Sequence, residues 1–489
     1  MSKKQRVVVI GAGIGGLTAA ALLAHRGYEV LVFEQALVPG GCASTFKRRG
    51  FTFDVGATQV AGLERGGIHD RIFTELGIDI PAATYCDPAC AVYLPDEIEP
   101  INIWRDRTRW QAERQKQFPG SEPFWQFFQD LFDRSWRFQS RDPILPPRNL
   151  WDVKQLLQAL RSDTLATVPF TFSTVGDALR GFGLDRDRRL RTFLDLQLKL
   201  YSQVNAEETA LLYAATALAV SQAPLGLFHL KGSMQVLSDR LVTSLERDGG
   251  KLFVQHSVES IESKDSPQVK VRYKDQVWWE PCDHVVANVT VQNLVKLLGD
   301  RVPKGYQKRV EKLEPASGAF VVYLGVDRKA IPVNCPPHLQ FLDKYEDTRS
   351  IFVSVSQPED GRAPDRKATI IASEFTDASA WWTCEDYARK KQEFTDRSIG
   401  QLGKFFDLDG SIEHQEAGTP RTFARYTGRD RGMVGGLGMR VSTFGPFGFA
   451  NRSPVKNVWL VGDCTHPGEG TAGVSYSALT VVRQIHQEH

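Results

Sequence analysis

Near the N-terminus, a cluster of glycines and one acidic residue have the types and spacing needed to bind a phosphorylated ligand. The glycines lie in the segment GAGIGG at residues 11–16, and the acid is Glu34. Gly11 permits a tight turn, Gly13 lets the backbone approach a pyrophosphate, and Gly16 lets the following helix pack closely against a strand. Glu34 is placed to accept hydrogen bonds from ribose hydroxyls, and its charge repels a 2′-phosphate. The chemistry indicated is the binding of a dinucleotide other than NADP.

The surrounding segments predict the strand–helix–strand unit that positions these residues. Val7–Ile10 is a continuous apolar run, as expected of a parallel strand buried on both faces. A helix rich in Ala, Leu and Thr follows and ends near Gly27, and Val30–Phe33 forms the second strand. The N-terminus of that helix presents unpaired N–H groups and a positive dipole end to a phosphate. A glycine motif alone is weak evidence, but here the strands, helix, glycines and acid occur in the register that such a site requires.

Further glycines predict contacts to a second portion of an extended ligand. Gly40-Gly41 and Gly56 follow the first unit, and paired glycines let a backbone run close beside a ligand, although Gly40-Gly41 also fits an ordinary turn. Near the other end of the chain, residues 457–461 predict a buried strand, which Gly462-Asp463 follows. A glycine-rich segment then leads into a helix predicted to begin at about Val474.

This order of segments resembles the flavin amine oxidase and phytoene desaturase superfamily over nearly the whole chain. The resemblance implies bound FAD, with Asp463 at the ribityl–pyrophosphate portion and Gly473 starting a helix that points at the flavin ring. Residues 231–237 and 248–252 resemble the family's central helix and strand, and Val258 falls where the family contacts adenine. The implied fold is α/β, with a discontinuous, GR2-type Rossmann-like FAD-binding domain, a mixed-sheet substrate domain and a helical, membrane-facing insert.

The resemblance also divides the chain and names its site residues. The FAD-binding domain is predicted at 1–102, 226–299 and 451–489, the helical insert at 103–225 and the substrate-binding domain at 300–450. His466 and Glu469 are predicted to handle protons or tune the flavin ring, although His466 also fits an ordinary loop residue packed near Pro467. The predicted cofactor-binding residues are Gly11, Gly13, Ile14, Gly15, Gly16, Glu34, Gln35, Gly40, Gly41, Gly56, Val258, Gly462, Asp463, Gly473 and Val474.

The C-terminal motif resembles one branch of the superfamily. Thr465–Gly470 is similar to the THPG ending of carotenoid desaturases, and Thr419–Phe423 to their TPxTF segment. The ending looks most like cyanobacterial carotenoid 3′,4′-desaturases, whereas carotenoid cis–trans isomerases more often have Phe-Pro-Gly-Gln-Gly at the positions of residues 466–470. The motif therefore favours a desaturase, in which a hydride leaves an allylic carbon for the flavin and a neighbouring proton is lost. An isomerase, an amine oxidase and a non-catalytic carotenoid carrier are the alternatives.

An aromatic and arginine-rich stretch occupies the predicted insert. Its rings are Trp104, Trp110, Phe118, Phe124, Trp125, Phe127, Phe128, Phe132, Trp136 and Phe138. Several of these rings recur at helical spacing, which fits a helical core. An equally weighted interpretation is that the rings, together with the nearby Arg134, Arg137 and Arg141, lie in the headgroup zone of a bilayer. The second interpretation predicts peripheral docking on the cytoplasmic side of a membrane, such as the thylakoid or plasma membrane of a cyanobacterium. Oxygen or a quinone is the expected electron acceptor.

Composition excludes several other functions. The 60 Lys and Arg residues nearly balance 58 Asp and Glu residues, so no strong field favours nucleic acid. The seven cysteines include no CxxC pair, which predicts free thiols in a reducing compartment. The sequence has no cluster of Cys and His residues, so it predicts no metal site. The longest nearly apolar stretch, Leu211–Val220, is too short to span a membrane.

Overall fold

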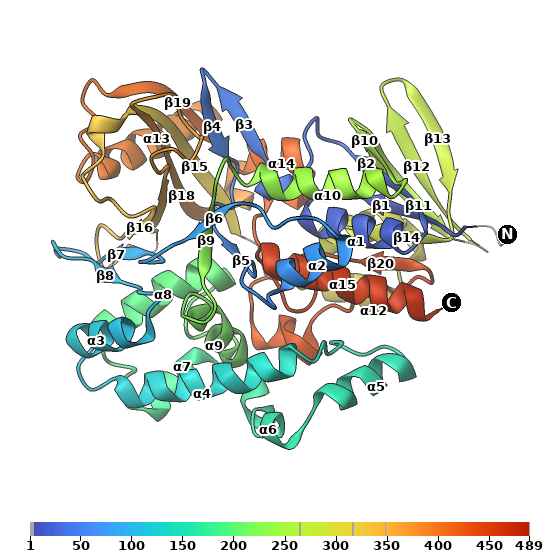
Figure 1. Cartoon of the computed structure of the whole chain (residues 1–489), viewed down its shortest axis with the longest axis horizontal. Coiled ribbons are helices and arrows are strands. Elements are labelled where there is room, and N and C mark those ends of the chain that lie inside the picture. Colours follow the sequence, from blue (N-terminus) through green and yellow to red (C-terminus); the bar gives the residue numbers. More distant parts are fainter. Residues whose placement is uncertain (1–3, 264–265, 315–316, 348, 489) are drawn as a thin grey trace.

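Figure 1 shows the computed structural model, which describes residues 4–263, 266–314, 317–347 and 349–488. A parallel sheet with strand order β10-β2-β1-β14-β20 lies on the right of this view. Its strands are β1 (Arg6–Ile10), β2 (Glu29–Glu34), β10 (Lys251–Val254), β14 (His284–Ala287) and β20 (Val458–Leu460). The strands predicted at residues 7–10, 30–33 and 457–461 are therefore confirmed, and the sheet joins segments from both ends and the middle of the chain.

Helix α1 (Ile14–His25) packs between α10 (Gln235–Arg247) and α15 (Thr471–Gln487) beside this sheet. The side chains of α1 are buried from its first residue to Ala24, as its small and apolar composition predicts. Helix α15 begins at Thr471, earlier than the predicted start at about Val474. The residue before it, Gly470, has a φ of 86°, so the irregular backbone ends directly before the first helical turn.

An antiparallel sheet of β11 (Ser257–Ser263), β12 (Pro267–Tyr273) and β13 (Gln276–Pro281) extends from the nucleotide-binding unit. Val269 and Val271 of β12 are fully buried, while Arg272 is exposed. The side chains of β12 thus alternate between buried and more exposed positions, as in a half-buried strand.

A second, mixed sheet has the strand order β19-β15-β18-β17-β16-β7-β8. Its strands are β7 (Ala91–Tyr93), β8 (Ile101–Asn102), β15 (Ser317–Asp327), β16 (His338–Phe341), β17 (Ile351–Val355), β18 (Lys367–Asp377) and β19 (Ile412–Gly418). The pair β16–β7 is parallel and the other pairs are antiparallel. The sheet therefore takes strands from both sides of the predicted boundary at residue 102.

A helical region forms the lower part of the molecule in Figure 1. Its helices are α3 (Arg107–Gln117), α4 (Glu122–Gln139), α5 (Leu150–Ala159), α6 (Ser162–Leu165), α7 (Val175–Gly181), α8 (Arg188–Ser202) and α9 (Leu211–Ala219). The aromatic side chains of α4 face inward, since Phe124 is fully buried and Phe128 is 4% exposed. Arg137 and Arg141 both pair with Asp163. The structure thus supports the helical-core interpretation of these rings, and docking of the rings themselves on a bilayer is not supported.

The remaining elements connect these layers. They are β3 (Thr45–Arg48), β4 (Phe51–Asp54), β5 (Val60–Ala61), α2 (Ile68–Leu76), β6 (Ala83–Tyr85), β9 (Leu227–Leu230), α11 (Val291–Leu298), α12 (Lys304–Glu311), α13 (Tyr387–Leu402) and α14 (Pro420–Thr427). Within the described ranges, no helix combines the length and the apolar character that crossing a bilayer requires.

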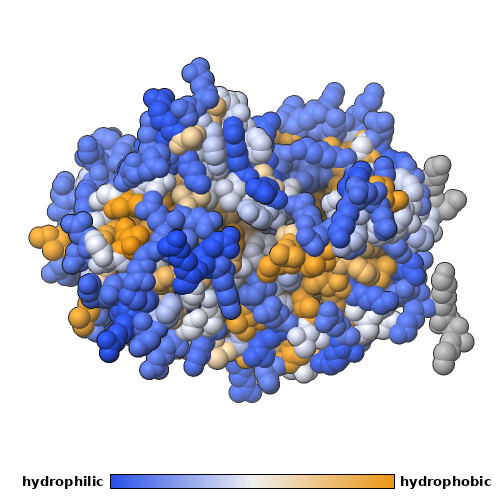
Figure 2. All heavy atoms as spheres, turned by 90° about the horizontal axis from the view of Figure 1, so that it is seen from above, coloured by the Kyte–Doolittle hydropathy of each residue, from blue (hydrophilic) through white to orange (hydrophobic). Residues whose placement is uncertain are grey.

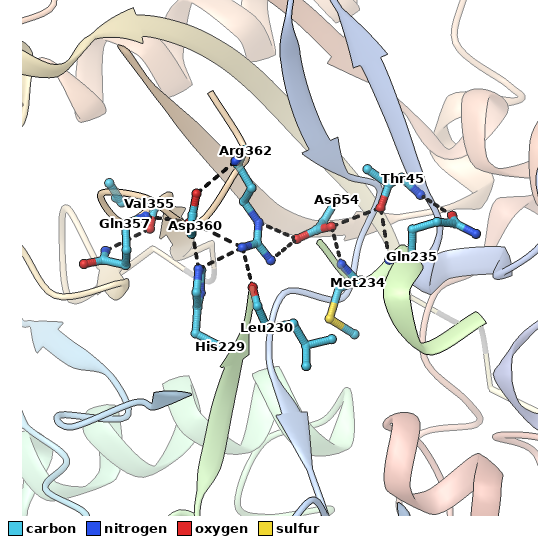
Figure 3. A network of polar contacts seen from close by, with 10 residues as sticks. All are labelled: Thr45, Asp54, His229, Leu230, Met234, Gln235, Val355, Gln357, Asp360 and Arg362. Carbon is cyan, nitrogen blue, oxygen red and sulfur yellow. Dashed lines mark hydrogen bonds and ion pairs between the residues drawn. The ribbon is translucent and has the colours of Figure 1, made fainter. Parts of the chain in front are cut away.

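A buried polar network joins β4 and β9 to the loop after β17 (Figure 3). The guanidinium of Arg362 lies 3.1 Å from the carboxylate of Asp54 and donates to the carbonyl oxygen of Leu230 at 2.6 Å. His229 Nε2 lies 2.9 Å from an oxygen of Asp360. Because the side chains of Arg362 and Asp54 are only 3% and 2% exposed, the loss of either one would leave an unpaired buried charge. The network fixes β4 and β9 against the loop after β17.

Candidate active site

One large cavity lies between the parallel sheet, the mixed sheet and the helical region, since residues of all three line it. Its volume is about 1060 Å³. Every predicted cofactor-binding residue except Gly16, together with His466 and Glu469, lines its wall. The structure therefore brings together predicted residues from both ends of the chain and from Val258 in the middle.

The turn between β1 and α1 forms the narrow part of the wall. Gly11 has a φ of 89°, a left-handed conformation that favours glycine. A Cβ atom on Gly13 would lie 2.8 Å from Asn288 Nδ2. On Gly16 it would lie 2.1 Å from the carbonyl oxygen of Gly11, which is impossible without moving the backbone. Gly16 thus lies behind the turn, in the packing role predicted for it, and outside the cavity wall.

Glu34, at the end of β2, is held by two backbone N–H groups. Its Oε2 accepts from Ala12 and its Oε1 from Ala36, both at 2.7 Å. Burial raises the pKa of Glu34, and these N–H donors oppose the rise. A carboxylate has about four lone-pair sites, so each oxygen retains one for a hydroxyl group in the cavity. This geometry fits the predicted contact to a ribose.

The loop after β20 is held against α15 by hydroxyl groups. The backbone N–H of Gly462 donates to Ser477 Oγ at 3.1 Å, and the Thr465 hydroxyl donates to the carbonyl oxygen of Gly462 at 2.8 Å. Thr465 and Ser477 lie 2.7 Å apart through their hydroxyl oxygens. These contacts fix Gly462 and the residues after it at the cavity wall.

Asp463 forms a partly buried ion pair with Arg429 at the cavity wall. The guanidinium and the carboxylate are 2.8 Å apart. Arg429 follows Gly428, whose φ of 67° ends α14 and turns the chain towards the cavity. Its guanidinium also donates to the carbonyl oxygen of Met433 at 2.8 Å. Burial alone would lower the pKa of Arg429, but the charge of Asp463 outweighs it and raises the pKa, so Arg429 is always charged.

His466 is a buried, neutral imidazole. Burial lowers its pKa to about 4. Its Nε2 lies 3.0 Å from Gln139 Oε1 at the end of α4, whereas Nδ1 has no partner in the described part of the chain. The ring lies 5.8 Å from the ring of Phe444 and 6.1 Å from that of Tyr476. His466 therefore lines the cavity wall, and its Nδ1 is buried without a hydrogen-bond partner among the described residues.

Glu469 is a buried carboxylic acid held by one side chain. Its Oε2 accepts from Gln203 Nε2 at 2.9 Å, and no described residue contacts its Oε1 by a hydrogen bond. Burial raises the pKa of Glu469 to about 8. Gln203 has a φ of 67° directly after α8, which turns its amide towards the loop of Glu469. At neutral pH, Glu469 is mostly protonated and can donate a hydrogen bond.

A family model described as flavin-containing amine oxidoreductase matches residues 14–486 of this chain. The chain belongs to the flavin-containing amine oxidoreductase family. It is an FAD-dependent oxidoreductase. The predicted superfamily and cofactor are thereby confirmed.

Individual relatives match nearly the whole chain at low identity. The chain is 27% identical to "Prolycopene isomerase, chloroplastic" of Daucus carota, over 99% of this chain and 80% of that protein. It is 27% identical to "zeta-carotene-forming phytoene desaturase" of Myxococcus xanthus, over 98% of this chain and 94% of that protein. The solved structure of cyclohexylamine oxidase from Brevibacterium oxydans IH-35A has a TM-score of 0.64 at 17% identity, covering 99% of this chain and 100% of that one. This structural likeness shows a shared fold.

The cavity wall of this flavin-containing family member fits FAD. Glu34 retains lone pairs for the adenosine ribose, and the glycine turn lies so close to Asn288 that a Cβ atom on Gly11 or Gly13 would come within 2.8 Å of it. Asp463 and Arg429 supply opposite charges where the chain re-enters the site after β20. These are the residues that would hold the cofactor.

Sequence reasoning missed three residues of this flavoprotein's site. Asn288 follows β14, contacts the glycine turn and donates to the carbonyl oxygen of Gly11 at 3.4 Å. Arg429 contacts Asp463 and Gln203 contacts Glu469, and each pair joins segments that are distant in the sequence. A signal existed for Asn288, since it ends an apolar run that a parallel sheet would place beside β1, whereas Arg429 had only the glycine before it.

Proposed function

We propose that this flavoprotein is a carotenoid desaturase that removes two hydrogens from an acyclic or monocyclic carotenoid, at C-3′,4′. The observation that supports this most directly is the shape and chemistry of the cavity. Beyond the glycine turn, most of its wall is apolar, with Leu200, Leu212 and Val220 from the helical region, Leu227 from β9 and Phe352 from the mixed sheet. A long polyene has no polar groups to bind, so a dry apolar wall is the recognition it requires.

The relatives support the same substrate class. The two relatives described above are named for carotenoid isomerisation and desaturation, and both match almost the whole chain. FAD supplies a two-electron acceptor, so the two hydrogens leave the substrate as a hydride and a proton. An external acceptor, oxygen or a quinone, then has to restore the cofactor. We place the enzyme peripherally on the cytoplasmic side of a membrane, where its substrate is dissolved.

The residues near the substrate divide the proton chemistry between them. With Gln139 Oε1 as acceptor, His466 Nε2 holds the ring proton and Nδ1 presents a lone pair. His466 is therefore the group that can take the proton lost from the polyene. Glu469 is protonated below about pH 8 and acts as a hydrogen-bond donor near neutral pH. Positioning by the apolar wall supplies most of the remaining catalysis.

A carotenoid cis–trans isomerase is the second candidate. It is favoured by the match to a prolycopene isomerase over 99% of this chain. The two activities differ in mass balance, because isomerisation removes no hydrogen.

The deciding experiment is product analysis. The FAD-loaded protein is mixed with an acyclic or monocyclic carotenoid in liposomes, and the product is measured by mass spectrometry and retention time. Loss of two hydrogens establishes a desaturase. An unchanged mass with a shifted retention time means an isomerase and refutes the desaturase. An unchanged carotenoid together with unbleached flavin under anaerobic conditions means a carrier and refutes both enzymatic functions.

A further inference from the structure

Helix α5 presents an apolar face to solvent. Leu150, Val153 and Leu157 are 89%, 39% and 62% exposed, and their spacing places them on one side of the helix. Their neighbour Leu156 lines the large cavity. In Figure 1, α5 and α6 lie at the lower edge of the molecule, with no element of the chain below them. The outer face of α5 thus lies directly beside a wall of the active-site cavity.

The cavity opens beside this helix. Three large apolar side chains both line the cavity and are exposed: Val168, Phe172 and Phe447, at 45%, 67% and 37%. Val168 and Phe172 belong to η2 (Val168–Phe172), and Phe447 to η8 (Gly445–Phe447). The rings of Phe172 and Phe447 lie 5.6 Å apart.

An aromatic path leads inward from this opening. Phe444 also lines the cavity, and its ring lies 5.5 Å from Tyr213 and 5.8 Å from His466. The opening at Phe447 therefore leads to the part of the cavity that His466 lines.

A cationic groove borders the same opening. This groove, of about 1010 Å³, is lined by Phe172 and Phe447 and by Arg148, Arg309 and Arg440, with Glu208 as its one acidic side chain in the described chain. Glu208 is paired with Arg440 at 2.8 Å. The groove therefore has an excess of positive charge.

Arg148 and Arg309 provide that excess. The guanidinium of Arg148 is exposed and has no hydrogen-bond or ion-pair partner in the ranges that the structure describes. Arg309 donates to the carbonyl oxygen of Gly448 at 3.0 Å and stacks 4.0 Å from the ring of Phe449, and it forms no ion pair with an acid among the described residues. Burial and then the charge of Arg148 lower the pKa of Arg309 below its usual value. Arg148 and Arg309 therefore place two positive charges in the groove that no described acidic side chain pairs with.

We propose that the opening docks on a bilayer that contains anionic phospholipid. The lipid phosphates would lie in the groove of Arg148, Arg309 and Arg440, and the side chains of α5 and η2 would enter the acyl boundary. Guanidinium groups suit phosphate, and exposed apolar side chains beside basic ones are typical of interfacial surfaces. Figure 2 shows the face of the molecule opposite to α5. Most of that face is hydrophilic, and its apolar residues form separate patches. The inference rests on the proposed function, since it gives a membrane-dissolved substrate its route to the cavity.

The test is vesicle binding by the full-length, FAD-loaded protein. Sedimentation is compared for vesicles of phosphatidylcholine alone and for vesicles that contain phosphatidylglycerol. A basic residue near an anionic leaflet contributes about fivefold to binding, so reversing the charge in Arg148→Glu is expected to weaken binding roughly 30-fold. Phe172→Ser is expected to weaken binding to both vesicle types, because its apolar ring no longer inserts.

Matched controls lie on the mixed-sheet side of the molecule. Arg366 has a side chain that is 89% exposed and Val333 is 90% exposed, so Arg366→Glu and Val333→Ser are expected to bind like the unchanged protein. Equal binding to both vesicle types, or equal losses in the test and control variants, overturns the proposal. Thermal unfolding and flavin content of each variant establish that it is folded.

Failure of docking is distinguishable from failure of the proposed function. Binding is read by sedimentation, and carotenoid conversion by the unchanged protein is read by product mass. A protein that binds phosphatidylglycerol vesicles through Arg148 but converts no carotenoid retains the docking surface and loses the proposed activity. A protein that converts carotenoid but binds no vesicles retains the proposed activity and loses the docking surface.

Discussion

Replacing Glu469 by glutamine tests whether a neutral carboxylic acid lies in the active site. In the structure, Oε2 accepts a hydrogen bond from Gln203 and Oε1 has no described partner. The amide oxygen of a glutamine at this position can accept the same hydrogen bond. Glu469→Gln therefore removes the ionisation and leaves the size and the hydrogen bond nearly unchanged.

The magnitude follows from the pKa of Glu469, which burial raises from 4.5 to about 8. Above pH 4.5 the unfolded chain ionises this carboxyl group, whereas the folded protein keeps it protonated. The free energy of unfolding therefore falls as the pH rises through this range. The contribution of Glu469 to stability is fully present below pH 4.5 and is lost as the pH rises to about 8. Each full pH unit in this window costs about 1.4 kcal/mol, and the loss reaches roughly 4 kcal/mol at pH 8, where the folded carboxyl group is half ionised. With an unfolding entropy of about 2.1 cal/mol/K per residue, this corresponds to a Tm difference of roughly 4 °C.

The assay is thermal unfolding of the FAD-loaded protein between pH 5 and pH 9. Glu469→Gln is expected to match the unchanged protein near pH 5 and to exceed its Tm by roughly 4 °C at pH 8. Glu99, whose side chain is 78% exposed, provides the control, since Glu99→Gln should show no such divergence. A constant difference between Glu469→Gln and the unchanged protein across this range would refute the raised pKa.

Three further predictions concern the cofactor and the proton. Gly16→Ala should lower both Tm and flavin content, because its Cβ would lie 2.1 Å from a backbone oxygen, whereas Gly305→Ala, with open space around it, should change neither; equal effects would contradict this. Arg429→Gln leaves the Asp463 carboxylate unpaired and should cost about 3–5 kcal/mol of stability with loss of bound flavin, which Arg429→Lys should partly restore. His466→Ala should reduce turnover by about 10²- to 10⁴-fold at unchanged flavin content, and an unchanged rate would remove His466 from the mechanism.

The parts of the site that the sequence predicts well are those specified by local backbone requirements. The segment at residues 11–16 needs its glycines because the turn has a positive φ at Gly11 and because the helix packs directly on a carbonyl oxygen at Gly16. Such requirements appear as residue types at short spacing, so strand, turn and helix are all visible in the sequence. The helix after Gly470 follows the same logic, and its predicted start was late because Thr471 and Ala472 read as part of the loop.

Long-range pairs carry no such local signature. Arg429 and Asp463 meet because α14 ends at Gly428, and Gln203 meets Glu469 because α8 ends in a left-handed residue. Both pairings depend on how the helical region and the mixed sheet pack against the parallel sheet. The aromatic stretch shows the same limit, since the spacing of Phe124 and Phe128 fits both a core and an exposed face, and only packing distinguishes the two.

The states of His466 and Glu469 bear on the choice between desaturation and isomerisation. Each desaturation releases a proton that some group has to take, whereas isomerisation releases none. Glu469, protonated up to about pH 8, cannot take it near neutral pH. His466 can, because its ring is neutral above about pH 4 and its Nδ1 has no hydrogen-bond partner in the part of the chain that the structure describes. So weak a base suffices only if the proton leaves a strongly acidic carbon, which is what loss of a hydride from a polyene creates. Desaturation by such a base should therefore keep a constant rate from about pH 5 to pH 7 and decline only as His466 becomes protonated near pH 4.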